Sequence, residues 1–154
     1  MMVRLSLLPT WFAATLLGLW AVTAVAQEGP VFRDIDDIAI LGYDPVAYFT
    51  VSEATKGTRD QLHEWLEAKW LFANRDHRTL FMSDPEKYAP QFGGNCTEGL
   101  ASGFRDSVDP TVWTIIEGRL YLFQNRETLK EFDENPALRL AAAEASWRRL
   151  RRLQ

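Results

Sequence analysis

The chain has 154 residues but only one cysteine, Cys96, and only two histidines, His63 and His77. A single cysteine cannot form a disulfide within the chain, so packing rather than cross-linking has to stabilise the fold. A structural zinc site takes four Cys or His ligands, and this chain offers three. The scarcity of thiols and imidazoles therefore argues against a disulfide scaffold and against a complete four-ligand zinc centre.

An excess of positive charge is also missing. The chain has 17 Lys and Arg against 21 Asp and Glu, a formal net charge of −4. Binding to nucleic acid needs a basic footprint, so nucleic acid is not an expected partner. The clearest basic cluster, Arg148, Arg149, Arg151 and Arg152, lies near the C-terminus. We interpret it as the solvated end of a helix, where cations complement the helix dipole, with contact to anionic lipid as the alternative.

Motifs of established chemistry are absent as well. The sequence has no Ser-His-Asp pattern, no phosphate-binding loop and no paired carboxylates at a catalytic spacing. It also shows no evident internal repeat or low-complexity segment. The sequence alone therefore gives no support to a hydrolase or to a nucleotide-dependent enzyme.

One long apolar run is present, over residues 5–25, and Arg4 precedes it. The run ends in Ala24-Val25-Ala26, which places small residues at the two positions that a signal peptidase reads. This pattern predicts a secretory signal over residues 1–26, cleaved before Gln27, with an uncleaved N-terminal anchor as the alternative. Cleavage would leave a periplasmic or secreted protein without an integral membrane segment, in an oxidising compartment.

Residues 27–154 predict one small α+β domain, because β-hairpins alternate with short helices. Asparagine is a favourable N-cap and marks where a helix begins, and the residue before a proline leaves helical geometry and marks where a helix ends. Glu117-Gly118 suits a two-residue hairpin turn. The expected elements are a hairpin over 62–73 with its turn near 67–69, a helix from Asn74 that ends at Asp84-Pro85, a hairpin of 111–116 and 119–123, a helix from Asn125 through Phe132, and a last helix from Pro136.

Several strings resemble the exported YHS-domain proteins. They are GYDPVAYF at 42–49, WLFA at 70–73, DPEKYAPQFGGNC at 84–96, the later hairpin with Trp113, and Trp147. The resemblance spans nearly all of the chain after the predicted signal, and the string at 84–96 is its most specific part. It implies a treble-clef-like core and a small metal- or ligand-binding module.

The resemblance also implies where metal-binding cysteines would stand. Such modules place one cysteine just after the strand's Phe and a second four positions further on. These positions are Ala73 and His77 here, and alanine has no donor atom. The two-cysteine pair is therefore missing, although a cysteine after the paired glycines, as in similar proteins, is present at Cys96.

Cys96 is the strongest candidate site residue. A thiol that follows Gly93 and Gly94 can receive backbone N–H donors, which would stabilise a thiolate. Together with His77 and His63 it would form a site suited to copper or zinc. Two alternatives stay open: a thiol-dependent redox enzyme in which Cys96 works with an external resolving thiol, and a structural or interaction domain in which the thiol is simply buried.

Two further polar residues have plain structural interpretations. His77 lies in the first turn of the helix expected after Asn74, where it could instead be an exposed surface residue. Asp44 precedes Pro45 and predicts a turn or helix cap.

Overall fold

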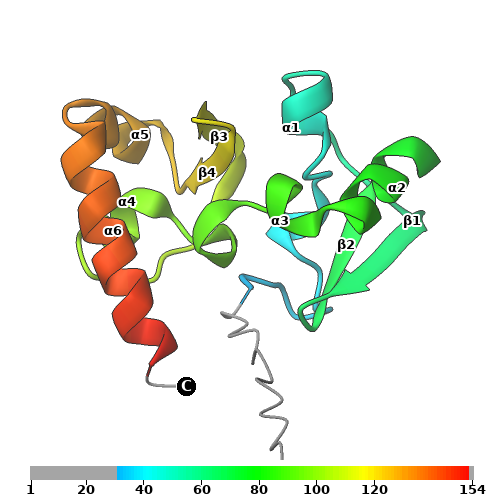
Figure 1. Ribbon diagram of the computed structural model, residues 1–154, viewed down its shortest axis with the longest axis horizontal. Coiled ribbons are helices and arrows are strands. Elements are labelled where there is room, and N and C mark those ends of the chain that lie inside the picture. Colours follow the sequence, from blue (N-terminus) through cyan, green and yellow to red (C-terminus); the bar gives the residue numbers. More distant parts are fainter. Residues whose placement is uncertain (1–30, 153–154) are drawn as a thin grey trace, which may run out of the picture.

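The structure, a computed structural model that describes residues 31–152, has two halves that lie side by side (Figure 1). The described residues form helices and two antiparallel two-stranded sheets, which confirms the predicted small α+β fold. The first half contains η1 (Ile40–Gly42), α1 (Ala47–Thr50), β1 (Thr58–Trp65), β2 (Ala68–Phe72), α2 (Arg75–Ser83) and α3 (Pro85–Tyr88). The second contains η2 (Gln91–Gly94), α4 (Thr97–Ala101), β3 (Asp109–Ile116), β4 (Arg119–Phe123), α5 (Arg126–Asp133) and α6 (Pro136–Arg151).

The predicted signal over residues 1–26 and its cleavage point before Gln27 lie outside the described residues. Between residues 31 and 152, no helix combines the length and the apolar character that crossing a bilayer requires.

Both hairpins close through two residues with left-handed backbone. The φ angles are 51° and 57° at Leu66 and Glu67, and 51° and 73° at Glu117 and Gly118. This turn geometry matches the right-handed twist of the strands. The second turn lies where it was predicted, but the first lies one residue earlier than expected, and β1 already begins at Thr58. The first turn contains no Gly or Asn to mark its left-handed positions, so the sequence gives no local signal for it.

The two halves follow the same path, which corrects the sequence-based conclusion that the chain has no repeat. Thr58 pairs with Phe72 as Asp109 pairs with Phe123, a constant shift of 51 positions along the chain. Both hairpins have a register irregularity at the same place, and each is followed by an Asn-capped helix and then by a helix that begins at proline. Identical residues at this shift include Leu71 and Leu122, Phe72 and Phe123, Asn74 and Asn125, Arg75 and Arg126, Phe81 and Phe132, and Pro85 and Pro136.

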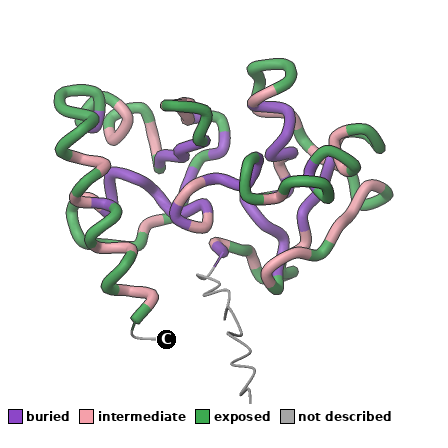
Figure 2. The backbone as a smooth tube through the Cα atoms, in the orientation of Figure 1, coloured by how far each residue is buried: buried purple, intermediate pink, exposed green. Residues whose placement is uncertain are grey.

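The buried side chains of the described residues form two clusters, and the first of them draws residues from both halves. The first cluster of buried side chains gathers around Trp70 and Phe81 but also includes Leu120, Leu122 and Cys96 from the second half. The second cluster comprises Phe92, Leu100, Val112, Tyr121, Phe123, Phe132 and Ala143. Figure 2 shows the chain buried where the halves meet, whereas most of α6 is exposed or half-buried. The first cluster therefore joins the two halves.

Candidate functional site

Cys96 is the N-cap residue of α4 and is fully buried, with 0% of its surface exposed. Its Sγ accepts a hydrogen bond from the backbone N–H of Gly99 at 3.4 Å. Its backbone N–H donates to the carbonyl of Asp106 at 3.3 Å, and a parallel bridge joins it to Leu122 of β4. The backbone donor that was expected for the thiol is therefore present, but Cys96 lies inside the first cluster of buried side chains, which joins the halves.

The structure does not bring the three predicted metal ligands together. His63 lies on β1 and pairs with Trp70 of β2, and its ring centroid is 6.3 Å from that of Phe81. His77 lies on α2, where its ring contacts Asp44 and Thr50. Across residues 31–152, no three His, Cys, Asp or Glu side chains are grouped so that they could hold a metal ion. The described residues thus do not fit the metal that the YHS resemblance implies, and copper or zinc binding through Cys96, His77 and His63 stays a prediction.

Because Cys96 is buried, we expect its thiol to react slowly with reagents in solution. In the native protein, we expect 5,5′-dithiobis(2-nitrobenzoate) to react with Cys96 at least about 100-fold more slowly than in the urea-unfolded chain, because attack requires an opening of the core. The reaction can be followed by absorbance, and Cys96→Ser gives the blank. Equal rates in the native and unfolded states would contradict the burial and would favour the thiol-redox alternative.

Asp44 is the most highly connected buried polar group of the first half. Its side chain is 0% exposed and lies between η1 and α1. One carboxylate oxygen, Oδ1, accepts the backbone N–H of Val46 at 2.9 Å. This hydrogen bond closes the turn that Asp44 was expected to form. The other oxygen, Oδ2, accepts the N–H of Ala73 at 2.8 Å and lies 2.6 Å from Nδ1 of His77. Asp44 therefore joins the beginning of α1, the end of β2 and α2 at one point.

His77 is held from both sides of its ring. The Asn74 side chain accepts the backbone N–H of His77 at 2.9 Å, so the N-cap of α2 fixes His77 in the first turn of the helix. Its Nε2 lies 3.1 Å from Oγ1 of Thr50, at the end of α1. The His77 side chain is 13% exposed, whereas Thr50 is exposed. His77 thus connects a buried carboxylate to an accessible hydroxyl through its two ring nitrogens, and it is not a free surface side chain.

Buried Tyr48 lies on α1, the same short helix as Thr50. Burial raises the pKa of the Tyr48 hydroxyl, and the nearby groups Tyr43, Asp109 and Asp44 raise this pKa further. The hydroxyl donates to the carbonyl of Pro110 at 2.9 Å. Tyr48 therefore stays a neutral donor and anchors α1 to the second half.

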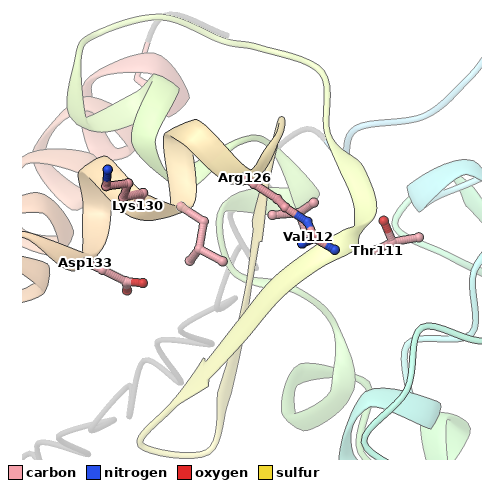
Figure 3. Close-up of a pocket in the computed structure, with 6 residues that line it drawn as sticks. Thr111, Val112, Arg126, Lys130 and Asp133 are labelled. Atoms are coloured by element: carbon pink, nitrogen blue, oxygen red, sulfur yellow. The ribbon is translucent and has the colours of Figure 1, made fainter.

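A separate hollow of about 350 Å³ lies between β3 and α5. Its lining consists of Thr111, Val112, Arg126, Leu129, Lys130 and Asp133. Figure 3 shows the Arg126 side chain reaching towards Thr111 and Val112, with Lys130 and Asp133 further along the helix. Among the described residues, neither Arg126 nor Lys130 has a carboxylate within ion-pair distance. The hollow therefore combines apolar walls with two cations and one carboxylate, Asp133. Hydrogen bonds from Thr111 and the nearby charge of Arg126 lower the pKa of the Asp109 carboxyl.

Comparison with known proteins gives no match among family models, curated proteins or solved structures.

The internal repeat provides a comparison within the chain itself. At the shift of 51 positions, Asp44, His77 and Thr50 correspond to Asn95, Thr128 and Ala101. Asn95 is buried like Asp44, but its amide donates to the carbonyl of Phe92, and Thr128 completes a capping box with Asn125. The connection of carboxylate, imidazole and hydroxyl thus belongs to the first half, although both halves share the backbone path.

Sequence reasoning identified part of this arrangement. It singled out His77 and placed it correctly in the first turn of a helix after Asn74, but as a metal ligand or a surface residue. It assigned Asp44 only a local turn, and it overlooked Thr50. The string at 42–49 contains Asp44, but nothing in the sequence indicates that it meets a histidine 33 positions further on.

Proposed function

We propose that this chain is an exported YHS-type module that binds a small organic anion in the hollow between β3 and α5. The observation that carries the proposal is the pair Arg126 and Lys130, which line the same hollow without ion-pair partners among the described residues. Like charges one helical turn apart destabilise a helix, and a bound anion would relieve their repulsion. The positive end of the α5 dipole, where Arg126 is the first residue, adds to the attraction.

The lining also indicates which anions would fit. Arg126 offers planar paired donors that match a carboxylate, and Val112 and Leu129 offer apolar contact to the body of a ligand. Asp133 lies at the same hollow and would repel a second negative charge. A monocarboxylate with a compact apolar body therefore matches this surface best, and a volume of about 350 Å³ suits a ligand of that size.

Calorimetric titration with benzoate and with benzyl alcohol tests the proposal. We expect benzoate to bind and the neutral alcohol to bind at least about tenfold more weakly, because only the carboxylate engages the two cations. Arg126→Gln and Lys130→Gln should each weaken benzoate binding. Arg75→Gln is the matched control, since Arg75 occupies the same repeat position at the start of α2. Equal affinities for the two probes, or an unaffected Arg126→Gln protein, would contradict the proposal.

The Cys96-centred metal site predicted from the sequence needs a test of its own. Copper and zinc can be titrated into the mature protein and into Cys96→Ser. A site centred on Cys96 requires the variant to bind more weakly, and equal affinities would rule that site out. The benzoate titration does not depend on this result, because Cys96 does not line the hollow.

A further inference from the structure

We propose that Thr50 is a nucleophile, activated by His77 and oriented through Asp44, that accepts an acyl group from small carboxylic esters. This activity is separate from the proposed anion binding, because none of the three residues lines the hollow between β3 and α5. It rests on the two contacts that Nδ1 and Nε2 of His77 make on opposite sides of the ring.

The hydrogen bonds of Asp44 determine which nitrogen of His77 has the proton. Asp44 already accepts two backbone N–H groups, from Val46 and Ala73, as an ionised carboxylate does. Its 2.6 Å contact with Nδ1 of His77 then requires the proton to reside on Nδ1. In the neutral ring, Nε2 consequently presents its lone pair to the hydroxyl of Thr50.

The hydroxyl proton of Thr50 has two acceptors at the same distance. Oγ1 lies 3.1 Å from the carbonyl oxygen of Val46 and 3.1 Å from Nε2 of His77. Rotation about one bond moves the proton from the helix carbonyl to the imidazole. In the second orientation, the hydroxyl of Thr50 can pass its proton to His77, a base that the buried carboxylate of Asp44 supports.

The residues near Thr50 and His77 in the chain include two exposed aliphatic side chains, Val51 and Leu80. Thr50 is exposed, and the next residue, Val51, is 57% exposed. Leu80 follows His77 by one turn on α2 and is 38% exposed. Exposed aliphatic side chains thus adjoin both Thr50 and His77, and they favour a short apolar acyl group over a charged one.

The reaction balances with the ester and water alone. Thr50 Oγ1 attacks the ester carbonyl carbon while His77 Nε2 takes the hydroxyl proton, which forms a tetrahedral adduct. The bond to the leaving oxygen then breaks, and Nε2 returns the proton to that oxygen, leaving an acyl ester on Thr50. Water, deprotonated by Nε2, attacks this ester and releases the carboxylic acid, and the proton returns to Thr50 Oγ1.

Thr79 provides a matched control for a purely structural role. Its Oγ1 donates to the carbonyl of Arg75 at 2.9 Å, the same bond to the preceding turn that Thr50 makes to Val46. Thr79 is exposed like Thr50, but its hydroxyl has no imidazole partner. A reaction that depends on His77 should therefore distinguish Thr50 from Thr79.

The experiment is acylation by p-nitrophenyl acetate, followed by release of nitrophenolate and, after an acid quench that stops hydrolysis of the acyl ester, by peptide mapping of the acetyl group. We expect the acetyl group on Thr50, its absence in Thr50→Val, and an unchanged rate in Thr79→Val. His77→Gln should slow acetylation about 100-fold, the usual contribution of a general base. Thr50→Ser should stay reactive, which keeps the test valid even if His77→Gln fails to fold.

Three outcomes would overturn the proposal. They are the absence of an acetyl group on Thr50, an equal rate in Thr79→Val and Thr50→Val, and a rate in folded His77→Gln equal to that of the unsubstituted protein. Acetylation of lysines alone would also overturn the proposal, because Thr50 would then have no acetyl group.

Discussion

Replacement of Asp44 by alanine is expected to destabilise the protein by about 3–5 kcal/mol, a large part of the stability of a small domain. The carboxylate accepts the N–H groups of Val46 and Ala73 and pairs with His77, all at a point that solvent does not reach. Alanine would leave two backbone donors and one imidazole N–H without an acceptor. Each unsatisfied buried donor costs about 1–3 kcal/mol, so the losses together exceed the effect of an ordinary surface substitution.

Urea denaturation of Asp44→Ala, followed by far-UV circular dichroism, measures this loss. Asp84→Ala is the control, because Asp84 also caps a helix, accepting the N–H of Lys87 at 3.3 Å, but from an exposed position. That substitution should cost about 1 kcal/mol, the usual contribution of an N-cap. If both variants unfold at the same urea concentration, Asp44 is not the buried junction described above.

A less disruptive substitution separates stability from chemistry at this junction. Asp44→Asn keeps the shape of the side chain but turns one acceptor into a donor. The amide therefore loses either the N–H of Val46 at the Oδ1 position or both Ala73 and His77 at the Oδ2 position. If the acylation proposal holds, a folded Asp44→Asn protein should acetylate Thr50 more slowly, because a neutral amide cannot stabilise the imidazolium that forms when Nε2 takes the hydroxyl proton. An unchanged acetylation rate would leave Asp44 with a purely structural role.

Features of the fold that depend on neighbouring residues were predictable. Asn74 and Asn125 cap their helices through their side chains, as expected, and Pro136 begins the last helix. The turn at Glu117-Gly118 lies where a glycine at a left-handed position would put it. Each of these signals acts over a few residues, so the sequence displays it directly.

Features that depend on distant contacts were not predictable. Asp44 and His77 meet only because the turn before α1 lies against the end of β2 and the first turn of α2, and no local sequence pattern indicates this contact. Cys96 follows two glycines, which suggested a reactive thiol, but residues of both halves enclose it in the core. The repeat is inconspicuous in the sequence because its identical positions are mainly core and capping residues, separated by surface positions that differ.

The second large effect is expected at Phe81, whose replacement by alanine should cost about 3–5 kcal/mol. Phe81 is fully buried, and its ring centroid lies 5.1 Å from that of Trp70, 5.2 Å from Phe72 and 5.6 Å from Trp65. Alanine would remove the side chain on which these rings converge, and a rigid hairpin cannot close the resulting cavity. Aromatic pairs of this kind also contribute beyond their buried area.

Thermal unfolding of Phe81→Ala should be compared with Leu80→Ala, since Leu80 is the preceding residue on α2 but is 38% exposed. Leu80→Ala should cost less, about 1–2 kcal/mol, because part of its side chain is already in contact with solvent in the native state. Phe132→Ala tests the repeat itself: Phe132 occupies the equivalent position, is also fully buried, and its ring centroid lies 5.1 Å from that of Phe123. Because the first cluster of buried side chains joins the halves, either phenylalanine variant should still unfold in one transition at a lowered temperature, and two separate transitions would show that the halves unfold independently.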